Sequence, residues 1–269
     1  NEYIWNGGEK VLSEERRIRI LEILEKERGI KVSDLVRVFN VTGATIRRDL
    51  SALEKEGLVK RTHGGAVLPQ SFSFEPLYAT KKRQNLKEKT AIGEKAAELI
   101  DDGETVFIET GSTTLQIARN IKNRHDLTVL TNSIDVAREL LNARGVEVIL
   151  TGGNLRKETL ALIGPLAERV LREFRVDKVF LGISGIIPGK GMSTASIVEA
   201  QIKKLIIEMG KEVIGVADHS KFGKECFAFV APTEVLNKIV IDDKVPSKYI
   251  EDLRSEGVEV IICSPEDVK

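Results

Sequence analysis

The sequence of 269 residues is poor in cysteine, histidine and aromatic residues, and each shortage excludes a class of protein. It contains 2 Cys and 3 His in separate segments, so neither a disulfide framework nor a metal site is expected. Two lone thiols favour a reducing, cytoplasmic environment. Runs of about 18 apolar residues are missing, so we expect no membrane span. The N-terminal segment lacks the apolar core of a secretory signal peptide.

The chain also has no net charge, because 41 Lys and Arg residues balance 41 Asp and Glu residues. The balance differs between its two parts. Residues 1–95 contain 19 Lys/Arg against 14 Asp/Glu, and residues 96–269 contain 22 against 27. A modestly basic front and an acidic rear favour a nucleic-acid-binding module joined to a part that does not touch nucleic acid. Because the basic excess is small, we expect a homo-oligomer, either a dimer or a tetramer.

Three helices are predicted near the N-terminus, over residues 13–28, 33–39 and 43–56. In the third, Ile46, Leu50 and Leu53 recur on one face. Thr42 is its expected N-cap and Gly57 its expected stop. Two helices joined by a tight turn and packed on another helix form a helix-turn-helix. Taken alone, the third segment is explained equally well by an ordinary solvated helix.

Short strands on either side of His63-Gly64-Gly65 predict a hairpin with basic residues, the wing of a winged helix. Residues on this hairpin, or facing away from the apolar stripe of the third helix, are the expected contacts to double-stranded DNA. They are Thr42, Ala44, Thr45, Arg47, Arg48, Ser51, Lys55, Arg61 and His63. A solvated hairpin without a DNA-binding role is the alternative for the wing.

A long series of residues here resembles the N-terminal domain of DeoR-family bacterial transcriptional regulators: Thr45-Ile46-Arg47-Arg48-Asp49-Leu50, Leu53-Glu54, Gly57-Leu58 and Arg61-Thr62-His63-Gly64-Gly65-Ala66. The resemblance implies a winged helix-turn-helix over residues 11–68 that binds an operator. Pro69, Ser71, Ser73 and Pro76 then break the pattern and predict a linker over residues 69–85. The run Lys81-Lys82-Arg83 is either a solvated connector or a contact to DNA phosphate.

Apolar strands alternate with amphipathic helices over residues 86–269. Strands are expected at 105–108, 127–130, 146–150, 179–183, 212–217 and 258–262, and residues 162–174 are expected to be helical. The alternation predicts an α/β domain of Rossmann-like type, whose open and mostly parallel sheet is covered by helices on both faces. Ligands bind such sheets at the carboxyl ends of the strands.

Polar, glycine-rich segments follow four of these strands. Gly111-Ser112-Thr113-Thr114 runs into a helix, where backbone N–H groups and hydroxyls favour a phosphate cradle. The other three segments contain Thr131 and Asn132; Gly152, Gly153 and Arg156; and Asp218, Lys221 and Gly223. A turn explains each segment alone. Four at one sheet edge favour a pocket for a small phosphorylated, hydroxyl-rich molecule.

The same segments resemble the effector domain of the DeoR family, which is related in fold to ribose-5-phosphate isomerases and CoA transferases. The resemblance covers about residues 14–262. It implies that Gly111–Thr114 holds a sugar phosphate and that Asp218 and Lys221 sense the sugar or its phosphate. Glu199 and Lys203 would lie close by, although an i,i+4 surface salt bridge explains that pair equally well. Glu109 departs from the family, which usually has Asp there.

These patterns predict a transcriptional regulator, a repressor of a sugar-metabolism operon, whose operator affinity is controlled by a phosphorylated sugar. Catalytic residues and cofactors are not expected, since the sugar acts as an effector. The alternative is a sugar-phosphate isomerase-like enzyme with a DNA-binding front. Isomerisation needs a carboxylate base. Related isomerases carry a cluster of acidic residues after a central strand. The corresponding strand here leads into Leu181-Gly182-Ile183-Ser184-Gly185, which contains no carboxylate. A DNA-binding architectural protein with an inert rear domain is a third interpretation.

Overall fold

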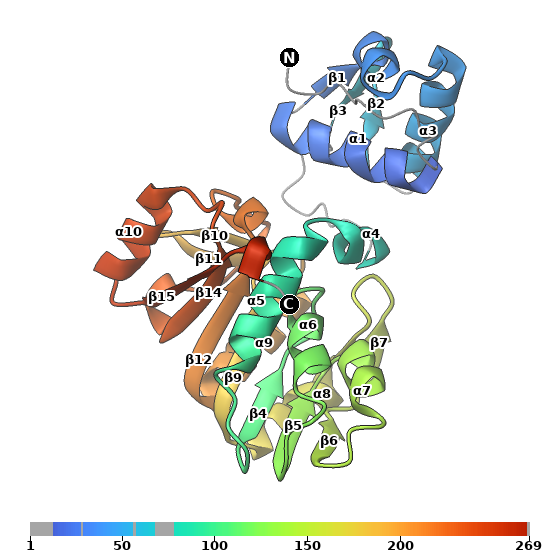
Figure 1. The fold of residues 1–269 in the computed structure, drawn as a ribbon. Helices are drawn as coiled ribbons and strands as arrows, with labels where there is room; N and C mark the ends of the chain where they lie inside the picture. Colours follow the sequence, from blue (N-terminus) through green and yellow to red (C-terminus); the bar gives the residue numbers. More distant parts are fainter. Residues whose placement is uncertain (1–12, 28, 56–57, 68–77, 268–269) are drawn as a thin grey trace. The chain divides into compact units, whose positions relative to one another are not determined.

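The computed structural model describes residues 13–27, 29–55, 58–67 and 78–267. The chain forms two compact units, residues 1–84 and 85–269, each described here by itself (Figure 1). Gly57, the expected stop of the third helix, lies outside the described residues, as do residues 69–77 of the expected linker. The later part of that linker forms a short helix, α4 (Tyr78–Arg83).

The N-terminal unit contains the predicted helix-turn-helix and wing. Its elements before α4 are α1 (Ser13–Glu27), β1 (Gly29–Lys31), α2 (Val32–Phe39), α3 (Gly43–Lys55), β2 (Lys60–Arg61) and β3 (Gly65–Val67). The wing hairpin is antiparallel β2–β3, and β1, which the sequence did not predict, pairs with the other edge of β3. The predicted N-cap is confirmed, because the backbone N–H of Thr45 donates to Oγ1 of Thr42 at 3.2 Å.

Apolar faces of the three helices meet in one core, in which Ile20, Leu35 and Ile46 are fully buried. A buried ion pair joins α1 to α3 beside this core. Nε of Arg16 lies 2.6 Å from Oδ2 of Asp49, and both side chains are less than a tenth exposed. Burying one of these charges alone would cost desolvation free energy, and the opposite charge of the partner offsets that cost.

We expect the Asp49→Ala variant to lose about 3 kcal/mol of unfolding free energy, because it removes the buried carboxylate that faces the Arg16 guanidinium. Urea denaturation measures this loss. The control is Glu15→Ala, which removes an exposed i,i+4 pair with Arg19 and should cost about 0.5 kcal/mol or less. Equal losses for the two variants would contradict the prediction.

A seven-stranded sheet organises the C-terminal unit, in the order β15-β14-β12-β9-β4-β5-β6 with every neighbouring pair parallel. Its strands are β4 (Thr105–Ile108), β5 (Leu127–Thr131), β6 (Val146–Leu150), β9 (Val176–Gly182), β12 (Gly210–Ala217), β14 (Lys238–Asp242) and β15 (Glu259–Cys263). The predicted α/β class with an open parallel sheet is confirmed.

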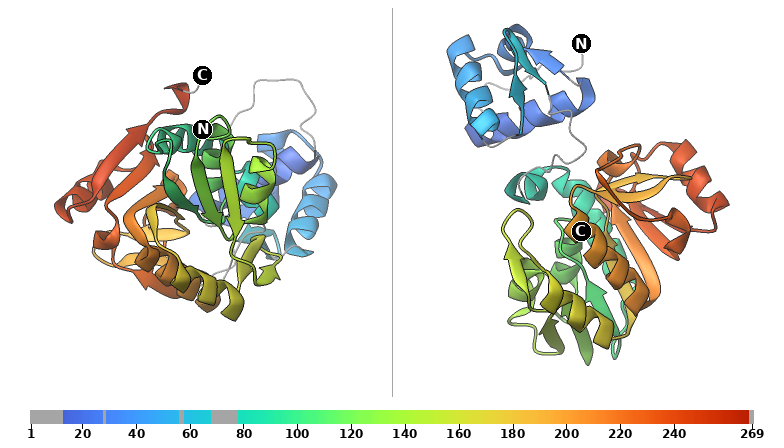
Figure 2. Two further views of the ribbon diagram at one scale, coloured as in Figure 1. Left: turned by 90° about the horizontal axis from the view of Figure 1, so that it is seen from below. Right: turned by 180° about the vertical axis from the view of Figure 1, so that it is seen from behind.

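Helices cover both faces of this sheet (Figures 1 and 2). One face carries α5 (Leu86–Ala97), α6 (Thr114–Asn120) and α7 (Ile134–Leu140); the other carries α8 (Pro165–Glu173), α9 (Ile197–Met209) and α10 (Ser247–Ser255). Successive strand residues alternate between the two cores. Val106 and Ile108 pack with the α5 face, whereas Phe107 between them packs with the α9 face.

The expected helix over residues 162–174 is wrong at its start. Residues 161–163 form β8 (Ala161–Ile163), which pairs antiparallel with β7 (Asn154–Arg156) in a separate hairpin. Gly164 then takes a φ of 89°, and α8 begins only at Pro165. Proline suits the first turn of a helix and cannot serve its interior, so the helix starts there.

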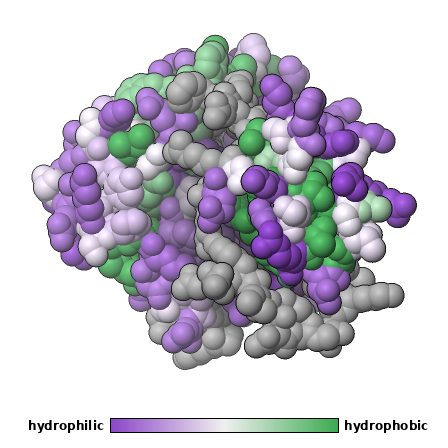
Figure 3. All heavy atoms as spheres, turned by 90° about the horizontal axis from the view of Figure 1, so that it is seen from above, coloured by the Kyte–Doolittle hydropathy of each residue, from purple (hydrophilic) through white to green (hydrophobic). Residues whose placement is uncertain are grey.

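A second, antiparallel sheet has the order β10-β11-β13, formed by β10 (Gly185–Ile187), β11 (Gly191–Thr194) and β13 (Ala228–Ala231). Within the described part of the chain, every helix is too short or too polar to cross a membrane. On the face shown in Figure 3, hydrophilic side chains surround smaller groups of hydrophobic ones.

Candidate functional site

The polar face of α3 is the candidate DNA-binding surface. Ile46, Leu50 and Leu53 are buried against the core of the unit, whereas Arg47 and Arg48 are exposed. All nine residues expected to contact DNA are exposed or half-buried: Thr42, Ala44, Thr45, Arg47, Arg48, Ser51, Lys55, Arg61 and His63. A narrow N-terminal end followed by two arginines suits base edges in the major groove and phosphates beside it.

The wing is joined to the end of α3 through Arg61. Its backbone N–H donates to Oε1 of Glu54 at 3.1 Å, and its Nη1 lies 3.6 Å from Oε2 of the same residue. At the base of the wing, a Cβ on Gly65 would lie 2.0 Å from the carbonyl oxygen of Ile30, so the β1–β3 contact requires glycine. Wing and α3 are therefore held together, with exposed cations on both.

The C-terminal unit has a topological switch point between β4 and β9. After β4 the chain winds through β5 to β6, and after β9 it winds the opposite way through β12 and β14 to β15. Ligands of open α/β sheets bind beside the carboxyl ends of the strands at such a point. Gly111–Thr114 follows β4, and Gly182 ends β9, so the predicted phosphate loop lies at the switch point.

Glu109 and Lys203 form a buried ion pair at this switch point. Nζ of Lys203, on α9, lies 2.6 Å from both carboxylate oxygens of Glu109 and donates to the carbonyl oxygen of Gly182, also at 2.6 Å. The N–H of Gly182 donates back to Glu109 at 2.9 Å. Burial raises the pKa of the Glu109 carboxyl, against the lowering effect of Lys203. The ends of β4 and β9 are thus fastened to α9.

Glu199 lies one turn before Lys203 on α9 and has different partners. It accepts a hydrogen bond from Oγ1 of Thr194 at 3.1 Å and pairs with Nη1 of Arg156. Glu199 and Lys203 are each 7% exposed, so the alternative of a surface salt bridge between them is wrong. Arg156 ends β7, and its pairing with Glu199 therefore anchors the β7–β8 hairpin to α9.

The side chains of three of the predicted ligand-binding residues make hydrogen bonds within the loops. The Thr114 hydroxyl donates to the carbonyl oxygen of Gly111 at 3.1 Å, and the Thr131 hydroxyl donates to that of Ile108 at 2.6 Å. Oδ1 of Asn132 accepts from the backbone N–H of Thr110 at 2.9 Å. Thr114, Thr131 and Asn132 are no more than 1% exposed. Their polar groups hold the loop that contains Ser112 and Thr113 in shape.

A second buried charge cluster surrounds Asp218, which directly follows β12. Nζ of Lys89, on α5, and Nζ of Lys221 lie 3.7 and 3.8 Å from its Oδ2. Nδ2 of Asn85 donates to Oδ1 at 2.9 Å, and the hydroxyl of Ser220 donates there as well, at 2.5 Å. Burial opposes ionisation, but the charges of Lys221 and Lys89 and these hydrogen bonds lower the pKa of Asp218 well below its usual range.

His219 extends this cluster to the end of β14. Its Nδ1 lies 3.0 Å from Oδ1 of Asp242, and its backbone N–H donates to Oδ2 at 2.6 Å. The hydrogen bond with Asp242 raises the pKa of the His219 imidazole, against the opposing effect of burial. Lys244 pairs with Glu88 of α5 beside it, and that hydrogen bond raises the pKa of Lys244.

The two charge clusters lie on opposite faces of the sheet at its carboxyl edge. Residues two apart on a strand point to the same face of the sheet. Phe107 packs on the α9 face, so Glu109 also points to that face, whereas Val216 packs on the α5 face, so Asp218 points there. Because α6 covers the α5 face, the loop of residues 110–113 leads the chain from the end of β4 to that face. The predicted phosphate loop therefore begins beside the Glu109 side chain, which is held on the α9 face, and ends on the α5 face.

The remaining predicted glycines shape turns. Gly152 and Gly153 have φ values of 68° and 110°, and a Cβ on Gly153 would lie 2.5 Å from the carbonyl oxygen of Ile163. They lead the chain from β6 into the β7–β8 hairpin. Gly223 has a φ of 69°, and a Cβ there would lie 2.5 Å from Oη of Tyr249. These positions require glycine for backbone reasons whether or not a ligand binds.

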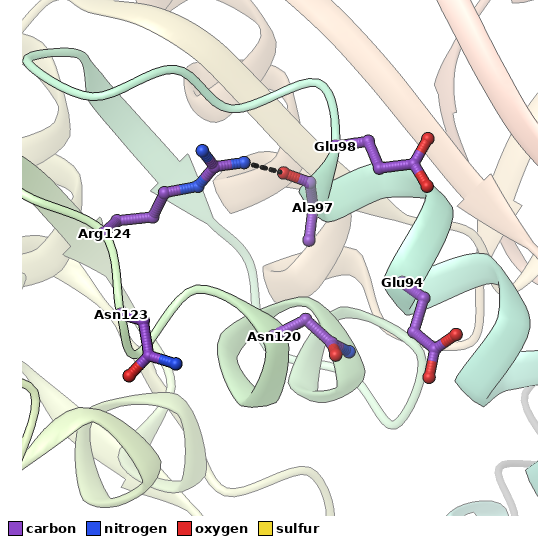
Figure 4. A pocket seen from close by; sticks show the side chains of 6 residues that line it. All are labelled: Glu94, Ala97, Glu98, Asn120, Asn123 and Arg124. Carbon is purple, nitrogen blue, oxygen red and sulfur yellow. Dashed lines mark hydrogen bonds between the residues drawn. The ribbon is translucent and has the colours of Figure 1, made fainter. Parts of the chain in front are cut away.

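A pocket of about 330 Å³ lies away from these residues, between the C-terminal ends of α5 and α6 (Figure 4). It is lined by Glu94, Ala97, Glu98, Asn120, Asn123 and Arg124. A guanidinium nitrogen of Arg124 donates to the carbonyl oxygen of Ala97 at 3.2 Å. The lining segments directly precede β4 and β5, so this pocket is at the amino edge of the sheet, opposite to the predicted site.

Lys89 and Glu109 were missing from the predicted site, although the sequence holds a signal for each. Lys89 lies on the buried face of α5 together with Ile92 and Ala96. The helical spacing of apolar residues predicts an apolar side chain at this position, and the sequence has a lysine there. Glu109 is a carboxylate directly after a fully buried strand. Charged residues at core positions need partners, and the partners come from segments far away in the sequence.

Comparison with known proteins places both units in one family. Residues 16–72 match the DeoR-like helix-turn-helix domain, and residues 84–243 match the DeoR C terminal sensor domain. The chain belongs to the DeoR family of transcriptional regulators. The suspected family is thereby confirmed over most of the chain.

Several relatives are similar to this DeoR-family chain over nearly its whole length. The putative aga operon transcriptional repressor of Escherichia coli O157:H7 is 36% identical over 260 residues, 95% of this chain and 97% of that protein. The regulator GlpR of Haloferax volcanii is 38% identical over 251 residues, 93% and 98% of the two chains. The glycerol-3-phosphate regulon repressor of Escherichia coli is 32% identical over 249 residues, again 93% and 98%.

Among solved structures, ribose 5-phosphate isomerase A of Methanocaldococcus jannaschii aligns with a TM-score of 0.39 and 18% identity, over 52% of this chain and 55% of that one. A likeness this distant carries no argument about activity. The relatives with higher identity are named as regulators, so the DeoR-family chain is a transcriptional regulator and the isomerase alternative gains no support from them.

The His219–Asp242 contact predicts a pH dependence of stability. The pKa of His219 is raised in the folded chain above its unfolded value of about 6.5. Its stabilising effect is therefore fully present below that value and is lost as the pH rises through the folded pKa. We expect His219→Gln to lower the unfolding free energy more at about pH 6 than at about pH 9, as measured by urea denaturation. In an Asp242→Asn background the pH dependence of this loss should be smaller, because only the charges of Asp218 and Glu88 then raise the pKa of His219, and an unchanged pH dependence there would contradict the assignment.

Proposed function

We propose that this DeoR-family protein represses a carbohydrate operon and that a small phosphorylated sugar or polyol sets its affinity for the operator. The observation that carries the proposal is the Asp218 cluster, in which Lys89 and Lys221 approach one buried carboxylate at the carboxyl edge of a parallel sheet. The two ammonium groups exceed the charge of the one carboxylate, and this local positive charge favours an anionic ligand.

Polar groups at the carboxyl edge of the sheet support a ligand rich in hydroxyls. Gly111, Ser112 and Thr113 supply backbone N–H groups and hydroxyls at the switch point, and Asp218 and Ser220 supply an acceptor and a hydroxyl at the end of β12. A phosphate would be recognised by cations and a sugar by these neutral groups and the carboxylate. One relative is named as the repressor of a glycerol-3-phosphate regulon, which supports an effector of this size and charge.

Control of DNA binding then follows from linkage. An effector that binds one arrangement of the chain more tightly shifts the population toward it, and only this difference in affinity matters. A coupling free energy of about 2.7 kcal/mol changes operator affinity about a hundredfold. A phosphate that reaches the two cations in only one of the two arrangements would supply a coupling of this size.

The DNA-binding half of the proposal predicts the effect of removing Arg48. After an operator has been selected from random oligonucleotides, Arg48→Ala should bind it at least about tenfold more weakly in fluorescence anisotropy, since one base or phosphate contact is worth about 1–3 kcal/mol. Arg138→Ala, which removes an exposed arginine of α7, is the matched control and should bind normally. A selection that enriches no sequence would refute DNA recognition.

The effector half predicts that Lys89→Met and Lys221→Met each weaken binding of a phosphorylated sugar at least about tenfold. A thermal-shift screen over sugar phosphates and polyol phosphates first identifies the ligand, and calorimetry then measures the affinities. Lys95→Met, on the exposed side of the same helix as Lys89, is the control and should bind like the wild type. Unchanged affinity in both variants would remove the Asp218 cluster from the site.

A further inference from the structure

The pocket between the C-terminal ends of α5 and α6 carries opposite charges on different walls (Figure 4). Glu94 and Glu98 belong to α5 and its C-terminal cap, whereas Arg124 belongs to the turn after α6. In Figure 4 the Glu94 carboxylate and the Arg124 guanidinium lie on opposite sides of the pocket. Within the described residues no ion pair joins these two side chains. The pocket therefore separates a negative group from a positive one.

Both charged groups keep binding capacity for a ligand. The Glu94 carboxylate has no hydrogen-bond or ion-pair partner in the described part of the chain, whereas Glu98 is paired with Nζ of Lys95 at 2.6 Å. The Arg124 guanidinium donates from one nitrogen to the carbonyl oxygen of Ala97 at 3.2 Å. A guanidinium has five N–H groups, so donors remain on Arg124 after this bond. One carboxylate and one guanidinium thus line the pocket with unused hydrogen-bonding positions.

The walls of the pocket are fixed by the close packing of α5 on α6. A Cβ on Gly93 would lie 2.2 Å from Cβ of Gln116, so the two helices approach each other closely. Asn120 and Asn123 add side-chain amides to the lining, and Nδ2 of Asn120 donates to the carbonyl oxygen of Gln116 at 2.9 Å. The volume of about 330 Å³ lies within the range of sites for small molecules. The walls are thus in place before a ligand binds.

We propose that this pocket binds a small zwitterion, an α-amino acid, which carries both an ammonium and a carboxylate group. The ammonium group pairs with Glu94 in the last turn of α5, where the helix dipole also favours a cation. The carboxylate accepts hydrogen bonds from the Arg124 guanidinium. A ligand with only one of these charges meets a like charge on the other wall. The amides of Asn120 and Asn123 are left for polar groups of the ligand's side chain.

This site goes beyond the proposed function, because neither the Asp218 cluster nor the phosphate loop lines it. The pocket is at the amino edge of the sheet, whereas those groups are at the carboxyl edge. The sugar-phosphate titrations depend on Lys89 and Lys221, and the amino-acid titrations depend on Glu94 and Arg124. The two proposals are therefore tested separately.

Calorimetric titration of the full chain with each of the common α-amino acids tests the proposal. We expect at least one of them to bind with a Kd below about 1 mM. The amine that lacks the carboxylate of this amino acid, and the acid that lacks its ammonium group, should each bind at least about tenfold more weakly, because each loses one ionic contact. No binding of any amino acid, or equal binding of the amine or of the acid, would overturn the proposal.

Two variants locate the binding at this pocket. Glu94→Gln and Arg124→Gln should each lower the affinity for the amino acid at least about tenfold. Glu251→Gln on α10 is the matched control, because it also removes a helix carboxylate without a partner among the described residues, and it should bind like the wild type. Arg124→Gln also loses the hydrogen bond to Ala97, so Glu94→Gln decides the question if circular dichroism shows Arg124→Gln to be unfolded. Wild-type affinity in Glu94→Gln would remove the amino acid from this pocket.

Discussion

Charged side chains buried at the carboxyl edge of the parallel sheet are the constraint on which the C-terminal unit depends. A carboxylate or ammonium removed from water must find an opposite charge and further hydrogen bonds. Glu109 finds Lys203 and the N–H of Gly182, and Asp218 finds Lys89, Lys221 and polar neighbours. Each pair joins a strand end to a helix of a different layer, so the loops at this edge are placed by electrostatics as much as by apolar packing.

The N-terminal unit uses the same device on a smaller scale. The Arg16–Asp49 pair sets α3 against α1, and only the opposite side of α3 is then left for DNA. Such pairs contribute little net stability compared with apolar residues of similar size, but they penalise any arrangement in which one partner is buried alone. We infer that the buried ion pairs of both units favour one arrangement of the helices over others and add little to the unfolding free energy. A single arrangement suits a regulator, because its function depends on where its binding surfaces lie.

Helices and strands that leave a pattern in neighbouring residues could be predicted from the sequence. Contacts between residues far apart along the chain could not. The stripe of Ile46, Leu50 and Leu53 and the strands β4 and β6 follow from the local sequence pattern alone. The strand over residues 161–163 was mistaken for helix because an apolar run of that length has no period, and only Gly164 and Pro165 mark the boundary. The contacts of Lys89 and Glu109 were not predicted, because their partners, Asp218 and Lys203, lie 129 and 94 residues further along the chain, and spacing along a chain does not show such pairs.

The attachment of residues 110–113 at both ends has a consequence for any ligand that binds them. The segment is preceded by Glu109, which is paired with Lys203 of α9, and it continues into α6, which packs along α5. A ligand bound to this segment therefore lies next to residues that are fixed to the helical layers on both faces of the sheet.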